Sequence, residues 1–165
     1  MQFKANVLGV VHSIHAFYSL LRAGPTKQIV VIASEVGTAS FIRAAGLAEG
    51  ATYGMSKAAS LLTVTKYALK LAPEGFTVVN LSPGLVDTSG TAAVGEGPDP
   101  ARHARMGLIV GHFASMGQKA VMQTPEQSVK LQLEAIDGLT KEQNGLMLSP
   151  TAEVCLPGMT AAVQG

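Results

Sequence analysis

The sequence predicts a single α/β domain, spanning residues 1–165, that is built on a parallel sheet. Helical and strand-like segments alternate along the chain, and this order is typical of parallel strands joined by helices. The two clearest strands, residues 28–33 and 76–81, are short apolar runs, as expected of strands covered on both faces. Right-handed crossovers would then place helices on both faces of the sheet.

The first predicted helix spans residues 2–22. Its apolar residues recur at three- and four-residue steps, so they should form one buried stripe. Gly24 and Pro25 end the helix, because Gly suits a C-terminal cap and Pro cannot continue the helix. The predicted stripe consists of Phe3, Val7, Val10, Ile14, Phe17 and Leu21.

The sequence of the middle part of the chain predicts a loop, a second helix and the second strand. Residues 35–52 are rich in Gly, Ala and Ser and are interpreted as a loop that follows Ser34. The helix runs from Tyr53 to Leu71 and stops at residues 73–75, and residues 82–84 break the second strand. The predicted buried stripe of this helix consists of Ala58, Leu61, Leu62, Thr65, Ala68 and Leu69.

The last part of the chain is less regular. Residues 86–122 have no clean periodicity and suggest only a short helix within residues 108–120. Residues 124–126, Thr-Pro-Glu, are a good helix start, and Gly138 ends that helix. Residues 146–148 suggest a third strand, which completes a partial doubly wound sheet.

Composition and charge exclude several classes of function. Hydrophobic residues make up 47% and charged residues 14%, with a formal net charge of +1, so nothing points to nucleic acid or an anionic membrane. No segment is long and apolar enough to span a bilayer. The single cysteine, Cys155, and the scattered histidines provide no metal-ligand spacing. We therefore expect no metal site and a reducing compartment, the cytoplasm.

Tyr53 and Lys57 are the first candidate catalytic residues. They are four positions apart near the start of a predicted helix, which places both side chains on one face. Alone, this pair is a weak signal, because many helices contain a partly packed Tyr beside a solvated Lys. Its context strengthens it: Ser34 ends the preceding strand and Pro83-Gly84 ends the following one. In open parallel sheets, ligands bind at these strand ends.

These motifs, in this order, resemble the short-chain dehydrogenase/reductase family. They are Asn6 in Asn-Val-Leu-Gly, Ser34 after Ile-Val-Val-Ile-Ala, Tyr53-Gly-Met-Ser-Lys57, and residues 80–88, Asn-Leu-Ser-Pro-Gly-Leu-Val-Asp-Thr. The resemblance extends from the first residues to about Leu148 and implies a Rossmann-like fold. It implies an oxidoreductase that transfers hydride between NADP or NAD and a small carbonyl or alcohol substrate. NADP is favoured over NAD by analogy with carbonyl reductases.

The resemblance also assigns roles to the catalytic residues. Tyr53 would be the general acid or base, and a nearby ammonium, that of Lys57, favours the phenolate. Lys57 would also bind the cofactor ribose. Ser34 would hydrogen-bond the substrate oxygen, and Asn6 would hold a water that links the lysine to solvent.

The segment after the second strand is expected to be a cofactor loop. Pro83 and Gly84 permit a tight turn with close approach of the backbone to a flat ring. By resemblance, the main chain of Val86 would bind the nicotinamide amide and the Thr88 hydroxyl would reach the pyrophosphate. Residues 89–123 would shape the choice of substrate.

Two departures from the family pattern qualify these expectations. The glycine-rich turn that grips the pyrophosphate should precede Asn6, so we expect a chain truncated at its N-terminal side, with one edge of the sheet exposed. Ser34 and Tyr53 are 19 positions apart, which is longer than usual and resembles the carbonyl-reductase-like branch that includes sniffer and C-factor proteins.

Alternatives to an active enzyme remain open. An inactive fragment and a non-enzymatic interaction module, which pairs through the first two helices, both fit the sequence. By resemblance, a full-length protein would form a homo-oligomer through these same helices.

Overall fold

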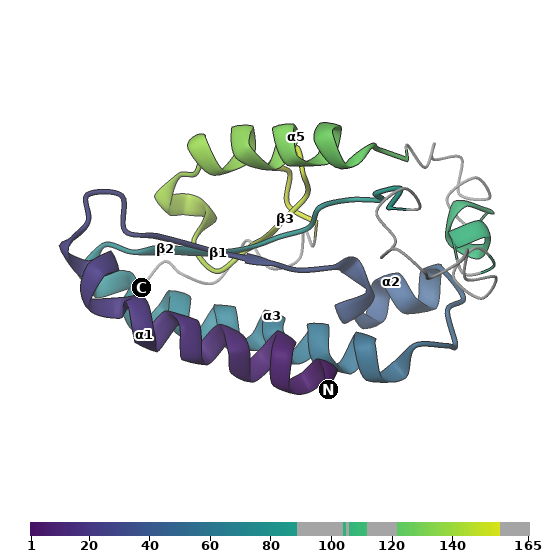
Figure 1. Cartoon of the computed structure of the whole chain (residues 1–165), viewed down its shortest axis with the longest axis horizontal. Helices are drawn as coiled ribbons and strands as arrows, with labels where there is room; N and C mark the ends of the chain where they lie inside the picture. Colours follow the sequence, from purple (N-terminus) through teal and green to yellow (C-terminus); the bar gives the residue numbers. More distant parts are fainter. Residues whose placement is uncertain (89–103, 105, 112–121, 156–165) are drawn as a thin grey trace, which may run out of the picture.

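The computed structural model describes residues 1–88, 104, 106–111 and 122–155, and within them it confirms the α/β fold. A three-stranded sheet lies between helices on both faces (Figure 1). The longer elements are α1 (Gly9–Ala23), β1 (Gln28–Ile32), α2 (Ala39–Ala44), α3 (Ala51–Leu71), β2 (Thr77–Leu81), α5 (Pro125–Asp137) and β3 (Met147–Leu148). Short helical turns are η1 (Lys4–Leu8), η2 (Glu35–Gly37), η3 (Ala72–Glu74) and η5 (Lys141–Gln143).

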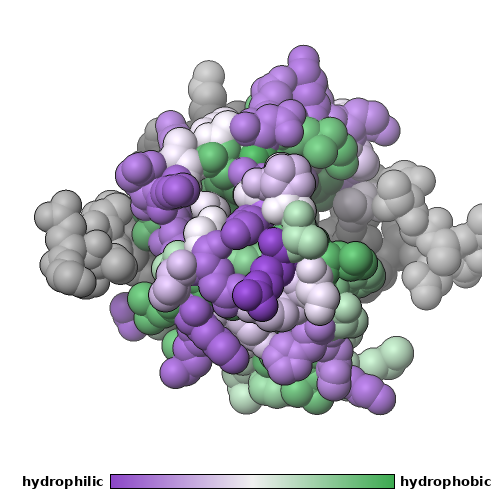
Figure 2. Space-filling view, turned by 90° about the vertical axis from the view of Figure 1, so that its left-hand side faces the viewer, coloured by the Kyte–Doolittle hydropathy of each residue, from purple (hydrophilic) through white to green (hydrophobic). Residues whose placement is uncertain are grey.

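The sheet has the order β1-β2-β3, and both strand pairs are parallel. Gln28 pairs with Thr77 and Ile32 with Leu81, so β1 and β2 end at the same level. Their carboxyl ends lie beside α2 and the start of α3 (Figure 1). Figure 2 looks onto the opposite end, where the strands begin and where hydrophilic residues gather at the centre of the face.

Strand β2 is buried along its whole length because it is covered on both faces. Its alternate residues enter two different core clusters, Val78 on the side of α1 and α3, and Val79 and Leu81 on the side of α5. This explains the continuous apolar run in the sequence. The first cluster also contains Ile14, Ile29, Val31, Val64, Ala68, Leu71 and Phe76, and the second Ala135 and Leu148.

The predicted stripe of α3 is wrong in part, since of its six residues Ala68 is buried but Ala58, Leu62 and Leu69 are exposed. The helix buries Ser56, Ser60, Val64, Ala68 and Leu71, whereas Leu62 and Leu69 are 60% and 58% exposed. The small side chains of Ser56, Ser60 and Ala68 on the inner face let α3 lie close to the sheet, whereas Leu62 and Leu69 project outward.

The predicted stripe of the first helix is wrong in part. Val7 and Ile14 are buried, but Phe3 and Phe17 are exposed. The helix is also not regular, because η1 is a π-helical turn in which Gly9 N–H donates to the carbonyl of Lys4. The extra residue in such a turn rotates the residues before it relative to those after it, so a single helical period cannot describe both.

Residues 35–52 are not the simple loop that their composition suggested. Turn η2 and helix α2 occupy part of this segment. Thr38 caps α2 by accepting a hydrogen bond from Phe41 N–H at 3.4 Å. The predicted helix within residues 108–120 and the predicted substrate loop, residues 89–123, lie in large part outside the described residues.

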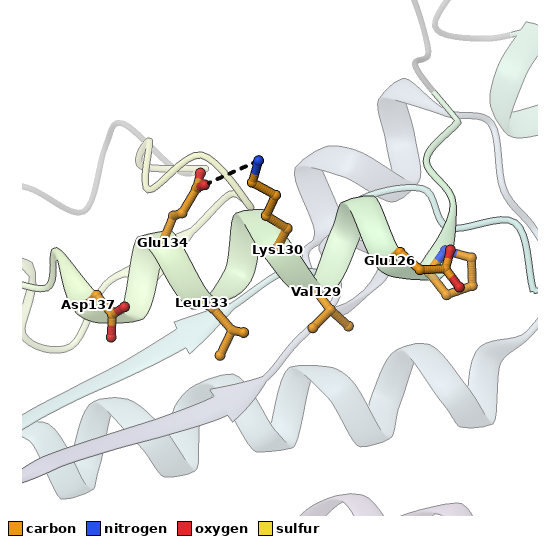
Figure 3. A pocket seen from close by; sticks show the side chains of 7 residues that line it. Glu126, Val129, Lys130, Leu133, Glu134 and Asp137 are labelled. Carbon is orange, nitrogen blue, oxygen red and sulfur yellow. Dashed lines mark ion pairs between the residues drawn. The ribbon is translucent and has the colours of Figure 1, made fainter.

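Strand β1 pairs on one side only among the described residues, and Ile32 is 47% exposed. On α5, Val129 and Leu133 are exposed as well. Their side chains point to one side of the helix, away from the Lys130–Glu134 ion pair (Figure 3). They line a shallow hollow of about 560 Å³. An open edge of the sheet was expected from the sequence.

Candidate active site

Tyr53 and Lys57 lie in the first two turns of α3, which begins at Ala51. The Nζ atom of Lys57 is 5.8 Å from the centroid of the Tyr53 ring, so the two side chains share one face of the helix. The Tyr53 side chain is accessible, with the residue 38% exposed. A phenol and an ammonium are thus held side by side at an exposed position.

Lys57 connects this turn of α3 to the carboxyl end of β1. Its Nζ donates a hydrogen bond of 2.9 Å to the main-chain carbonyl of Ile32, the last residue of the strand. Partial burial lowers the pKa of the Lys57 ammonium, because removal from water disfavours the charged form. The predicted catalytic lysine therefore lies at the strand end where ligands bind in parallel sheets.

Ser34 follows β1 by two residues and begins turn η2 in an extended conformation. This turn packs closely against α3: a Cβ atom at Gly37 would lie 2.9 Å from the main chain of Lys57 and Ala58. A Cβ atom at Gly54 would lie 3.1 Å from the carbonyl of Val36. The main chain after Ser34 is therefore fixed on the first turns of α3. Among the described residues, no hydrogen bond joins the Ser34 hydroxyl to Tyr53.

Asn6 lies in the π-helical turn η1, which contacts the same turn of α3. Its side-chain amide donates a 3.0 Å hydrogen bond to Ser56 Oγ, so it faces the residue immediately before Lys57. The structure thus brings Asn6, Tyr53 and Lys57 to one end of α3, with Ser34 across from them at the end of β1.

Pro83 and Gly84 form the turn that follows β2. Gly84 has a φ of +75°, and a Cβ there would lie 3.0 Å from Pro150 Cγ and 3.3 Å from Gln123 Nε2. Its N–H donates to Ser82 Oγ at 3.2 Å. Only glycine fits this combination of backbone conformation and close neighbours.

Gln123 fixes the main chain on both sides of Val86. Gln123 N–H donates to Leu85 O, and Asp87 N–H donates to Gln123 O, each at 2.9 Å. Val86 and Gln123 thus form an isolated parallel bridge. In this pattern the main-chain N–H and C=O of Val86 point away from Gln123. Thr88 is the last described residue of this segment and is half-buried.

Three residues that support the site escaped the sequence analysis: Ser56, Gln123 and Ser128. Ser128 is buried in the first turns of α5, and its Oγ donates to Pro83 O at 2.8 Å. Gln132 Nε2 in turn donates to Ser128 Oγ at 2.9 Å. Residues 124–126 predicted the start of α5, but no sequence signal placed Ser128 beneath the turn after β2.

Two absences hold for the described residues. No cluster of three His, Cys, Asp or Glu side chains in that part of the chain could hold a metal ion. No helix within those same residues has the length and apolar character needed to cross a membrane.

We expect Lys57→Met to remove a pH-dependent part of the stability. Because the folded state lowers the pKa of Lys57, the unfolded chain binds more protons at alkaline pH, and the contribution of this group to stability rises with pH. The free energy of unfolding of the unaltered chain should therefore rise, relative to the variant, as the pH approaches the ordinary pKa of a lysine, roughly 10.4, and the difference should level off above it. Urea unfolding at a series of pH values measures this difference.

The control for that experiment is Lys66→Met, which alters an exposed lysine of the same helix. For this variant, the curve of unfolding free energy against pH should run parallel to that of the unaltered chain over the whole pH range. Parallel curves for Lys57→Met and the unaltered chain would contradict the inferred effect of burial.

The fold, the strand-end position of the candidate residues and the sequence together define the class of protein. Residues 2–99 match the short chain dehydrogenase family, and the chain belongs to this family. The family resemblance that the sequence motifs suggested is thereby confirmed.

The chain is similar to particular members of this family. It is 40% identical over 146 residues to the short-chain dehydrogenase/reductase atnB of an Arthrinium species, covering 88% of this chain and 53% of the relative. The NADPH-bound carbonyl reductase from chicken fatty liver has a similar fold, with a TM-score of 0.67, 19% identity, and coverage of 92% of this chain and 54% of the other.

A second similar structure is the carbonyl reductase Sniffer of D. melanogaster, with a TM-score of 0.64 and 18% identity over 92% of this chain and 54% of the other. At these identities the two structural likenesses concern the fold alone. The chain spans about half the length of the relatives it matches.

Proposed function

We propose that this chain carries the proton-transfer part of an NAD(P)-dependent oxidoreductase that interconverts a carbonyl and an alcohol. The observation that supports it best is the pairing of Tyr53 and Lys57 at the carboxyl end of β1, where Lys57 is tied to Ile32. Family membership gives this pairing its chemical meaning.

Each candidate residue then has a distinct role. In the reductive direction Tyr53 gives its phenolic proton to the substrate oxygen, and Lys57 stabilises the resulting phenolate with its charge. The Ser34 hydroxyl orients the same oxygen. Asn6 supports resupply of the proton from solvent. When bound, the nicotinamide cofactor supplies or accepts the hydride.

The turn after β2 fits a nicotinamide cofactor. Gly84 leaves no Cβ in a crowded turn, so a flat ring could approach the backbone closely. The main-chain N–H and C=O of Val86, turned away from Gln123, have the donor and acceptor character that a carboxamide needs. Thr88 would contact the pyrophosphate.

We favour NADP over NAD and assign the chain to the carbonyl-reductase-like branch. Both choices rest on the long Ser34–Tyr53 spacing and on likeness in fold to two carbonyl reductases, one of them NADPH-bound.

The experiment is a turnover assay with NADPH or NADH and a panel of aldehydes and ketones. Because the chain spans half the length of its relatives, it is assayed both alone and joined behind the N-terminal half of the Arthrinium relative. We expect the chimera to oxidise NADPH in a substrate-dependent way. A folded chimera that binds neither cofactor and turns over no carbonyl would refute the proposal.

We further propose that α1 and α3 mediate self-association. The two helices lie on one face of the sheet (Figure 1), yet each exposes large apolar side chains. On α3, Leu62 and Leu69 are seven positions apart and share a face, and on α1, Phe17 and Leu20 are 57% and 70% exposed. Such exposed apolar residues on neighbouring helices are typical of protein interfaces.

We expect the double variant Leu62→Glu/Leu69→Glu to remain folded but to lose self-association. Burial of each leucine at the interface contributes about 1.5–3 kcal/mol to the free energy of association. Without both leucines, the dissociation constant should rise at least about 100-fold. Light scattering coupled to size-exclusion chromatography measures the mass. Leu133→Glu on α5, an equally exposed leucine on the other face of the sheet, is the matched control. A monomeric unaltered chain, or equal masses for all variants, would exclude this interface.

A further inference from the structure

Ser56 stands at the centre of a short chain of hydrogen bonds. Its hydroxyl donates to the main-chain carbonyl of Tyr53 at 2.8 Å and accepts from the side-chain amide of Asn6 at 3.0 Å. A serine hydroxyl has one proton to donate and lone pairs to accept, so both bonds can exist together. Ser56 is 0% exposed, so bulk solvent does not reach its side chain.

Asn6, at one end of this series of hydrogen bonds, lies in an uncommon backbone conformation. Residues Lys4–Leu8 form a π-helical turn, closed by the bond from Gly9 N–H to Lys4 O. Such turns are rare because their hydrogen bonds are less favourable than those of an α-helix, and they occur often at functional sites. The bond from Asn6 to Ser56 is a side-chain hydrogen bond between this turn and α3, fifty positions away in sequence.

The other end of this series of hydrogen bonds lies in the turn of α3 that carries Tyr53 and Lys57. Ser56 is between Tyr53 and Lys57, and its bond to the Tyr53 carbonyl lies within that turn. Because the hydroxyl is buried, removing it would leave the Asn6 amide facing an apolar methyl group. Asn6 is itself half-buried, so its amide should turn toward solvent to regain a hydrogen bond, and the π-helical turn should loosen.

We propose that Ser56 is a positioning residue that locks the Asn6 turn to the Tyr53–Lys57 turn. It touches neither the substrate nor the cofactor and acts through its two neighbours. The proposal rests on the proposed function, since it assigns Ser56 to the same proton-transfer site.

The structure offers a matched control. Ser60 is also buried, at 1% exposed, one helical turn further along the same face of α3. Among the described residues, it makes no hydrogen bond to Asn6. Ser56→Ala and Ser60→Ala therefore remove the same atom from two buried positions on one helix, and only the first breaks the hydrogen bond between η1 and α3.

The first arm of the test needs no activity. Amide hydrogen exchange of residues 4–9 is compared in the unaltered chain and in the two serine variants, with β2 as an internal reference for global stability. We expect exchange roughly tenfold faster or more in Ser56→Ala and within roughly twofold of the unaltered chain in Ser60→Ala. Equal exchange in the two variants would overturn the proposal.

The second arm measures carbonyl reduction by the active chimera as a function of pH. We expect Ser56→Ala to lower kcat roughly tenfold with little change in KM and to alter the pH profile, and to have no further effect in an Asn6→Ala background. Additive effects of the two substitutions would overturn the proposal. If the unaltered chimera is inactive, the proposed function fails, and the exchange comparison alone decides whether Ser56 couples the two turns.

Discussion

Replacing Tyr53 with Phe should lower the rate of carbonyl reduction by at least about 100-fold, because it removes the proton donor and leaves the ring in place. The Tyr53 hydroxyl makes no hydrogen bond in the described part of the chain, and the residue is 38% exposed, so the fold should tolerate the change. The measurement is kcat for a carbonyl substrate in the active chimera, together with the thermal unfolding midpoint.

Tyr67→Phe is the matched control, because it removes the same atom from a half-buried tyrosine further along α3. It should leave kcat within about twofold of the unaltered protein. A Tyr53→Phe variant that keeps more than a tenth of the activity would show that another group transfers the proton.

Replacing Gly37 with Ala should be the most damaging small change to the structure. The added Cβ would lie 2.9 Å from main-chain atoms of Lys57 and Ala58 and 3.1 Å from Leu61 Cδ1. The main chain of a helix cannot yield, so turn η2 must move away from α3, at a cost of about 1–3 kcal/mol. Ser34 moves with it, and activity should fall together with stability. Urea unfolding measures the loss.

Gly107→Ala serves as the control, because a Cβ there meets no atom within 4 Å. Gly107 lies in a helix, where Ala is favoured over Gly, so this variant should be unchanged or more stable by up to about 1 kcal/mol. A Gly37→Ala variant as stable as Gly107→Ala would show that η2 does not pack on α3 as described.

The strands and the last helix could be predicted because their signals are local. The consecutive apolar residues of β2 follow from its position between two covered faces. Thr124 and Gln127 form a complete capping box, so the start of α5 is encoded within four residues. The positions of Ser34, Tyr53 and Lys57 relative to these elements followed from the same signals.

Contacts between distant segments could not be predicted. Which side of α3 faces the sheet depends on how closely the helix approaches the strands. The small side chains of Ser56 and Ser60 lie on that side, and Leu62 does not. The bond from Asn6 to Ser56 and the bridge between Val86 and Gln123 join residues that are far apart in sequence. Periodicity along a single segment carries no information about such partners.

The most direct test of the proposed chemistry follows the hydride and the proton separately. The active chimera is given NADPH with deuterium at both hydrogen positions of its reacting carbon, together with a ketone, and the alcohol product is analysed by mass spectrometry. We predict one deuterium on the product carbon per cofactor oxidised, at a rate that collapses in Tyr53→Phe. Cofactor binding without any labelled alcohol from the unaltered protein would contradict the assignment of this site to carbonyl reduction.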